Sequence, residues 1–280
     1  RSIWVTGVQT CALPIYSRFL GASTFADGKR TSENKVTPKF SLSYDADDYL
    51  LYALAAEGYR VGGNNATLPG AIVSPPNYEP DSLWNYEVGL KAQWLDRRLQ
   101  ANLAVFRIDW SNMQSTVPRG DGFVHTINAG DARSRGAELE LRALIGTSFH
   151  VDASVGYTDA KLTTGRGTAV AGARLPGVPL HTYALGLQYD FAMGPIGSFV
   201  RADASYIGRA LSAFDRLTSA EMGGYTLGNI RLGLGGASWQ AAVFVENATD
   251  ERARVRATQQ FNGLFITPTI PLYGDRKSVV

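Results

Sequence analysis

The segment Trp84–Trp94 alternates apolar and polar side chains without a break, and this periodicity constrains the fold more than any other feature of the chain. A period of two indicates a β-strand, because successive side chains point to opposite faces of a sheet. Aromatic residues stand at both ends of the apolar face, with aliphatic residues between them. This order is typical of a strand that crosses a lipid bilayer with an aromatic girdle at each water interface.

The same alternation recurs along most of the chain. It is clear at residues 35–44, 149–158, 182–191 and 200–206, and weaker at 50–56, 99–110, 137–143, 226–234 and 239–245. The pattern predicts about ten strands, each close to the roughly ten residues that a tilted membrane-spanning strand needs. We therefore predict an all-β fold, an antiparallel meander of about ten membrane-spanning strands.

The phase of the alternation predicts which side chains face lipid and which face a polar lumen. We expect the outward set to be Tyr86, Val88, Leu90, Val151, Val155, Leu185 and Leu187. We expect the inward set to be Glu87, Lys91, Glu140, Asp152 and Gln188.

Short and long connections alternate between the expected strands. The short ones are polar or contain glycine and lie at 45–48, 96–98, 145–147, 192–196 and 235–238. The long ones are rich in residues that favour turns and lie at 60–83, 115–123, 163–178, 211–223 and 251–267. Outer-membrane barrels have short periplasmic turns and long extracellular loops. A soluble sandwich, the alternative all-β fold, has no reason to sort its loops by length.

The composition agrees with this fold but does not decide it. Hydrophobic residues make up 45% of the 280 residues, and no apolar run is long enough for a transmembrane helix. The formal net charge of +2 says little about partners, and no clustered basic stripe predicts nucleic-acid binding.

Both ends of the chain resemble translated sequencing adapter. Val5–Ile15 reads VTGVQTCALPI, and Asp275–Val280 reads DRKSVV. We predict that residues 1–15 and 275–280 are such artefacts and that residues 16–274 are a partial barrel. Cys11, the single cysteine, would then lie outside the native segment.

Residues from about 35 to 274 resemble the carboxy-terminal barrel half of TonB-dependent outer-membrane receptors. The last of the segments that carry the resemblance is similar to the family's N-L-x-D element, with Ala248 in place of leucine. The segments are Tyr49–Gly63, Tyr78–Lys91, Trp94–Trp110, Asn128–Glu140 and Glu246–Arg252.

The resemblance implies a barrel of about twenty-two strands around an amino-terminal plug. This chain is then expected to be an incomplete part of that barrel, without the plug, the energy-coupling segment, the first barrel half or the final strand. The implied function is energy-coupled uptake of a scarce bulky nutrient, foremost a ferric siderophore or similar iron chelate, across a Gram-negative outer membrane. The implied partners are outer-membrane lipid, the TonB complex acting through the plug, and the chelate. A passive porin-like or adhesin barrel without a plug is the alternative.

The charged and histidine residues do not indicate an enzyme, a metal site or a cofactor. His125, His150 and His181 show no metal-ligand spacing. Glu138 and Glu140 share a strand face with Arg142, but lumen-facing charges explain them better than acid–base catalysis does. No serine, histidine and acid combination is identifiable from spacing.

Aromatic and basic residues of the long loops and upper lumen wall are the candidates for ligand binding, because loops set specificity on a rigid scaffold. Such residues bind an anionic chelate by charge-assisted hydrogen bonds and stacking. For Trp110 a place in the aromatic girdle is the favoured alternative. The candidates are Tyr59, Arg60, Trp110, Arg119, His125, Arg133, Arg135, Phe214, Arg216 and Phe261.

Overall fold

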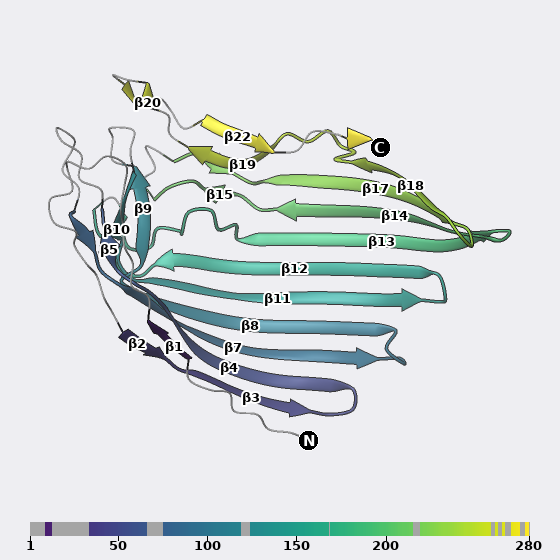
Figure 1. Cartoon of the computed structure of the whole chain (residues 1–280), viewed down its shortest axis with the longest axis horizontal. Coiled ribbons are helices and arrows are strands. Elements are labelled where there is room, and N and C mark those ends of the chain that lie inside the picture. Colours follow the sequence, from purple (N-terminus) through teal and green to yellow (C-terminus); the bar gives the residue numbers. More distant parts are fainter. Residues whose placement is uncertain are drawn as a thin grey trace.

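The computed structural model shows one curved antiparallel sheet with long connections at one end (Figure 1). It describes residues 9–12, 34–65, 75–118, 124–167, 169–214, 219–258, 261–262, 265–266, 270–274 and 278–279. No helix in these ranges is long and apolar enough to cross a membrane.

The sheet runs in chain order, and each long strand pairs with the one before it. Within the described residues it has 11 strands, of which the last contributes two residues. The predicted antiparallel meander of about ten strands is therefore confirmed. The strands are β3 (Lys39–Asp45), β4 (Tyr49–Arg60), β7 (Asp81–Trp94), β8 (Leu99–Ser111), β11 (Ala132–Ile145), β12 (Phe149–Leu162), β13 (His181–Met193), β14 (Ile196–Ile207), β17 (Tyr225–Gly235), β18 (Gln240–Glu246) and β23 (Ser278–Val279).

The connections are sorted by length to the two ends of the sheet, as the sequence predicts (Figure 1). The turn rim holds the tight turns at 46–48, 95–98, 146–148, 194–195 and 236–239. The loop rim holds the long connections at 61–80, 112–131, 163–180 and 208–224. Small ribbons form within three of them: β5 (Gly63–Asn64) with β6 (Asn77–Tyr78), β9 (Gln114–Pro118) with β10 (Val124–Asn128), and β15 (Ala210–Leu211) with β16 (Glu221–Met222).

The two faces of the sheet differ in the way that the alternation predicts. On the apolar face Val88 lies opposite Val105, and Leu187 lies opposite Val151. Val88 is 61% exposed, and the other described sheets are two-stranded, so a second sheet does not cover this face. The sandwich alternative is therefore wrong. The predicted outward and inward sets are confirmed, with the polar set on the opposite, hollowed face.

The segment Glu246–Arg252 folds into a turn organised by a buried asparagine. Asn247 is fully buried, and its amide nitrogen Nδ2 donates to the Glu251 carbonyl at 2.9 Å. Its Oδ1 accepts from the Glu251 backbone N–H at 2.9 Å, and its own N–H donates to Asn229 Oδ1 at 2.8 Å. These bonds anchor the exit of β18 on β17.

Parts of the predicted adapter segments pair with the rest of the chain. β1 (Gln9–Ala12) pairs with β2 (Asn34–Thr37), and β23 pairs with β18 at two positions. Farther along the chain, β19 (Ala253–Thr258) pairs with β22 (Ile270–Gly274), and β20 (Phe261–Asn262) with β21 (Phe265–Ile266). The adapter origin of residues 1–15 and 275–280 stays a prediction.

Candidate functional site

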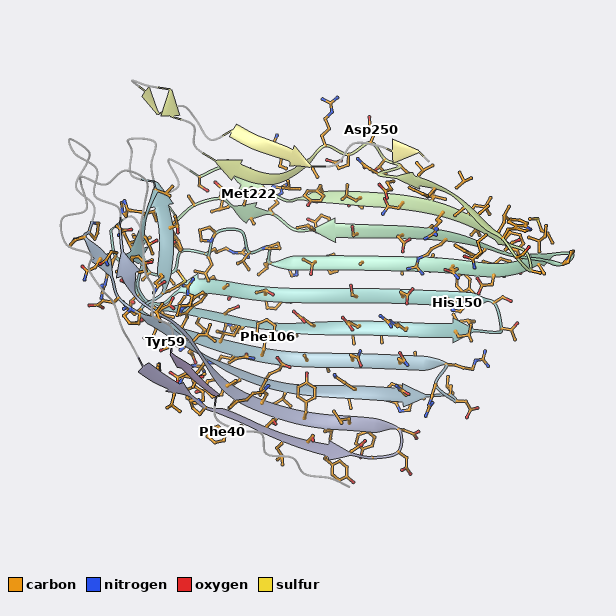
Figure 2. All side chains as sticks on the ribbon, in the orientation of Figure 1. Phe40, Tyr59, Phe106, His150, Met222 and Asp250 are labelled. Atoms are coloured by element: carbon orange, nitrogen blue, oxygen red, sulfur yellow. The ribbon has the colours of Figure 1, made fainter. Side chains whose placement is uncertain are left out.

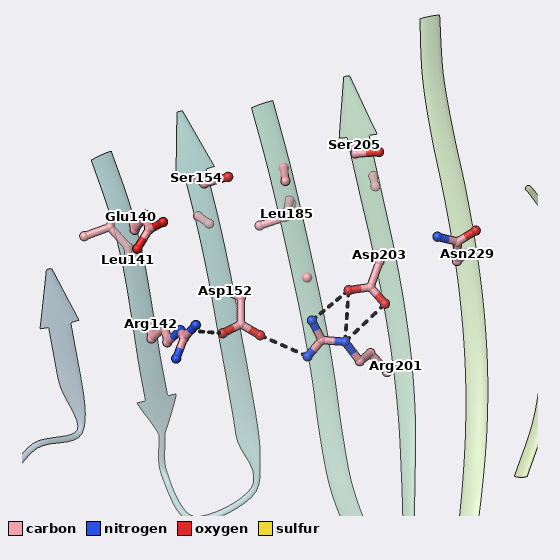
Figure 3. A pocket seen from close by; sticks show the side chains of 14 residues that line it. Glu140, Leu141, Arg142, Asp152, Ser154, Leu185, Arg201, Asp203, Ser205 and Asn229 are labelled. Carbon is pink, nitrogen blue, oxygen red and sulfur yellow. Dashed lines mark hydrogen bonds and ion pairs between the residues drawn. The ribbon is translucent and has the colours of Figure 1, made fainter. Parts of the chain in front are cut away.

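A row of alternating charges crosses the polar face on β11, β12 and β14 (Figure 3). We call Arg142, Asp152, Arg201 and Asp203 the charge ladder. Arg142 Nε lies 3.8 Å from Asp152 Oδ1, and Arg201 Nη1 lies 2.9 Å from Asp152 Oδ2. Arg201 also holds Asp203, with Nε 2.9 Å from Oδ1. The ladder carries equal positive and negative charge.

The register of four strands places these charges side by side. Arg142 lies opposite Asp152, and Asp152 and Asp203 both lie opposite Gly186 of β13. The Arg201 guanidinium occupies the space that a Cβ at Gly186 would fill. Glycine at this position therefore lets one arginine reach carboxylates on both sides. The ladder borders an open hollow of about 570 Å³.

The polar face is more acidic toward β4. Tyr52 Oη donates to Glu87 Oε1 at 2.7 Å, and Asn102 Nδ2 donates to Glu140 Oε2 at 3.3 Å. Lys91 Nζ lies 5.9 Å from the centre of the Tyr52 ring. These contacts line the polar face beside β4 with hydrogen-bonded carboxylates.

A buried carboxylate, Asp81, joins β4, β7 and β8 at the loop rim. Asp81 is 3% exposed, and Arg60 forms an ion pair with it. Trp110 Nε1 and the Gln114 backbone N–H each donate to Asp81 Oδ2 at 2.9 Å. The Arg60 guanidinium lies 4.9 Å from the Trp110 ring centre and donates to the Gln114 carbonyl at 3.0 Å. We call Arg60, Asp81, Trp110 and Gln114 the Asp81 hub.

Side-chain amides fasten the first two long connections to each other. Asn65 Nδ2 donates to the Thr126 carbonyl at 2.8 Å and Asn65 Oδ1 accepts from the Thr126 N–H at 2.8 Å, so the amide behaves like one more strand residue. Asn128 Nδ2 donates to the carbonyls of Glu79 and Asn112, both at 2.9 Å. These connections are therefore anchored to each other above the hub.

A small apolar cluster packs the connection at 163–180 against the connection at 112–131, beside Trp110 of the Asp81 hub. Met113 and Leu162 are each at most 5% exposed, and Thr164 Oγ1 accepts from the Asp131 N–H at 2.8 Å. The buried members are Met113, Ala129, Ala132, Leu162 and Ala169, with Trp110, Ala173, Leu175 and Phe214 packed against them.

Comparison with known proteins identifies the fold and the family. Residues 15–248 match the family described as "TonB dependent receptor-like, beta-barrel". The chain belongs to this family. It is 28% identical over 244 residues to the metal-pseudopaline receptor CntO of Pseudomonas aeruginosa, covering 86% of this chain and 32% of that protein. It is 30% identical over 181 residues to the ferrichrome outer membrane transporter/phage receptor of Escherichia coli K12, covering 62% and 23%.

Solved structures agree on the fold. The ferric yersiniabactin uptake receptor FyuA of Yersinia pestis matches with a TM-score of 0.75 at 20% identity, over 91% of this chain and 38% of that one. The ferric-catecholate import receptor Fiu of Escherichia coli K12 matches with a TM-score of 0.64 at 21% identity, over 96% and 39%. The chain spans 23–39% of the length of these four proteins. They are receptors and transporters, and the sequence-based expectation that the chain is not an enzyme agrees with the family.

Within this TonB-dependent receptor barrel, two candidate ligand residues lie together on the polar face. Arg60 and Trp110 meet in the Asp81 hub, with the Arg60 side chain half exposed. Trp110 lies opposite Leu83, which shares the phase of Glu87, so the girdle interpretation of Trp110 is wrong. Phe214 packs on the apolar cluster, and His125 lies opposite Val117 in the β9–β10 ribbon.

Three other candidates do not line the lumen, and the expectation that they do is wrong. Arg133 and Arg135 share the phase of Leu139, so they project from the apolar face, where they contact Asp109 and Asp159. Tyr59, at the loop-rim end of β4 (Figure 2), lies opposite Ser82, which shares the phase of Trp84, so it also belongs to the apolar face. Its ring lies 4.9 Å from Lys35 Nζ. The cause is strand phase, because an odd shift along a strand moves a side chain to the opposite face.

The remaining candidates cannot be placed by their side chains. Arg119 and Arg216 lie outside the described residues, and Phe261 is described by its backbone in β20 alone.

The histidines on the strands have local partners. His150, at the turn rim in Figure 2, shares a hydrogen bond of 2.6 Å between its Nε2 and Asp190 Oδ2. His181 stacks on Tyr183 with ring centres 6.1 Å apart. The part of the chain that the structure describes contains no group of three or more His, Cys, Asp or Glu residues suited to a metal ion.

Sequence reasoning missed the Asp81 hub and the charges at the loop-rim end of the apolar face. No local pattern marks Asp81, since its partners Arg60 and Trp110 lie 21 and 29 residues away. The charges on the apolar face could have been found from the sequence, because Arg107 and Asp109 continue the alternation of Leu103 and Val105 along β8.

Proposed function

We propose that this chain forms part of an outer-membrane receptor that takes up a bulky metal chelate, foremost a ferric siderophore, with energy delivered by the TonB complex through a plug domain. The proposal places the sheet in the outer membrane of a Gram-negative bacterium, with the loop rim outside the cell. The plug and the energy-coupling segment belong to the remainder of the receptor.

The two-faced sheet is the observation that carries this proposal. Exposed apolar residues such as Val88, Leu185 and Leu187 suit contact with acyl chains, whereas the opposite face presents the charge ladder to water. A wall of this kind can both sit in lipid and surround a hydrated plug. An open edge in lipid leaves backbone groups unpaired at a cost of several kcal/mol each, so the wall requires the rest of the barrel to close it.

The relatives support the choice of substrate class. Their names refer to metal-pseudopaline, ferrichrome, ferric-pyoverdine and catecholate siderophores. The family membership also favours this proposal over the passive porin-like or adhesin alternative.

For chelate contact we favour the polar-face pair Arg60 and Trp110. The half-exposed guanidinium of Arg60 keeps donors beyond those it uses on Asp81, and the indole offers an apolar surface beside it. His125, Phe214 and the loop residues Arg119, Arg216 and Phe261 complete the proposed contact set.

Uptake of a labelled ferric siderophore tests the proposal. The complete gene is expressed in a Gram-negative strain that lacks its own siderophore receptors, with and without TonB. We expect uptake of at least one siderophore class that depends on TonB. Equal entry without TonB, or permeation of small solutes alone, would show a passive barrel instead.

A further inference from the structure

The Asp81 hub presents hydrogen-bond donors to the lumen without a net charge. Arg60 Nε donates to Asp81 Oδ1 at 3.0 Å, and Arg60 Nη2 donates to the Gln114 carbonyl at 3.0 Å. These contacts leave the Nη1 amino group of a side chain that is 50% exposed to donate outward. The Asp81 carboxylate lies against the same guanidinium and is 1% exposed, so the positive charge of Arg60 is matched inside the hub.

The Trp110 indole adds an apolar surface to these donors. Its Nε1 is already used on Asp81, and the Arg60 guanidinium lies 4.9 Å from its ring centre. The hub therefore suits a ligand that places uncharged acceptor oxygens beside apolar atoms. A polyanion gains little extra attraction here, because the guanidinium already faces a carboxylate.

Carboxylates outnumber bases in the hollow next to the hub. Ile108, two residues from Trp110 on the same face of β8, lines this hollow of about 420 Å³. Its charged lining residues are Glu87, Glu138, Glu140 and Lys91. Adding Lys39, which lies on the same face opposite Ala56, still leaves three acids against two bases. A chelate seated on the hub faces this acidic hollow.

Ferric chelates of different donor classes differ in charge. A hydroxamate group binds Fe³⁺ as a monoanion and a catecholate group binds it as a dianion. Three hydroxamates therefore give a neutral complex, whereas three catecholates give a trianion. The oxygens of the neutral complex can accept from Arg60 at no electrostatic cost, whereas the trianion meets an excess of like charge in the hollow.

We propose that the Asp81 hub and the acidic hollow select ferric chelates of the neutral hydroxamate class over polyanionic chelates such as tris-catecholates. This inference rests on the proposed function and names the substrate class within it. It differs from the anionic chelate that the aromatic and basic residues suggested by themselves. The difference arises because Asp81 matches the charge of Arg60, and because Arg133 and Arg135 lie on the apolar face.

The test compares the binding of three ferric chelates to the complete receptor. A ferric trihydroxamate with a terminal amine supplies a matched pair, because acetylation of the amine gives a neutral chelate and succinylation adds a carboxylate to the same scaffold. We expect the succinylated chelate to bind about fivefold more weakly than the acetylated one, and the difference to shrink at high salt. A ferric tris-catecholate, the third chelate, should bind more weakly still.

The outcomes separate this inference from the proposed function. Binding of none of the chelates would contradict the proposed function, and the inference with it. Binding of the succinylated chelate or the tris-catecholate as tightly as the acetylated chelate would overturn the inference and leave the proposed function standing.

Asp81→Asn assigns the selectivity to the hub. The amide oxygen can still accept from Trp110 and Gln114, but the charge of Arg60 is no longer matched. We expect the roughly fivefold preference for the acetylated chelate to disappear. The matched control is Asp47→Asn, which removes the same charge from a turn at the opposite rim and should leave the preference unchanged. An unchanged preference in Asp81→Asn would contradict the role of the hub.

Glu138→Gln with Glu140→Gln tests the hollow and does not depend on whether Asp81→Asn folds. Both side chains are exposed on the polar face, so we expect the double variant to fold. Affinity for the tris-catecholate should rise by about fivefold, because two like charges are removed. An unchanged affinity would contradict the role of the hollow.

Discussion

The two faces of the sheet accommodate charge in different ways, although the same strands build both. On the polar face Arg201 and its carboxylates share a hydrated hollow, and the Arg142 side chain is 73% exposed. On the apolar face the charges gather at the loop rim, and the rows through Leu187 and Leu90 are apolar. Two residues that are adjacent in sequence, such as Leu187 and Gln188, therefore face different environments on opposite sides of the sheet.

The carboxylates of the polar face also differ in how deeply they are buried. The Asp81 side chain is 1% exposed and is held by a guanidinium, an indole N–H and a backbone N–H. Asp203 is 38% exposed and has Arg201 as its partner. The first carboxylate holds connections in place, and the second contributes to the potential of the lumen wall.

The largest effect is expected when the same substitution is made at two consecutive residues that lie on opposite faces of the sheet. Leu187→Arg in the complete receptor is expected to destabilise the inserted barrel by about 2–4 kcal/mol if the site lies near the bilayer midplane, because it places a charge in lipid. Gln188→Arg places the same group on the hydrated face and should be much milder. Urea unfolding in vesicles measures both, and equal losses would overturn the assignment of the faces.

A second substitution compares the buried carboxylate with the exposed one. Asp81→Ala leaves the Trp110 and Gln114 N–H groups without their acceptor, which we expect to cost about 1–3 kcal/mol. Hydrogen exchange should show faster opening of residues 112–118.

Asp203→Ala is the matched control for that substitution, because the same side chain is removed from the open wall. It should leave exchange at residues 112–118 unchanged. Similar exchange in the two variants would show that the Asp81 hub does not hold the connections.

The smallest expected effect concerns the charge ladder itself. Arg142→Gln removes an exposed ion pair of 3.8 Å and should change stability by less than about 1 kcal/mol. Thermal unfolding at low and high salt checks this, since added salt screens exposed charges. A loss as large as that of Asp81→Ala would mean that the ladder is structural.

The sequence by itself determined the strands, their faces and the sorting of connections by length. Alternation is a local property of an extended backbone, so Val88 and Glu87 could be assigned to opposite faces without knowledge of any partner. Arg133 and Arg135 share the phase of Leu139 on the same strand. We nevertheless expected them among the ligand-binding residues of the loops and upper lumen wall, whereas the register places them on the apolar face.

The tertiary structure alone decided which distant residues meet. Arg60, Asp81 and Trp110 converge because three strands of fixed register end at the same rim, and no spacing in the sequence encodes that convergence. The charged residues at the loop-rim end of the apolar face come together in the same way, because Asp109 and Asp159 lie opposite the arginines of β11. Register depends on the backbone hydrogen bonds between strands, so cross-strand partners follow from pairing and not from the alternation within one strand.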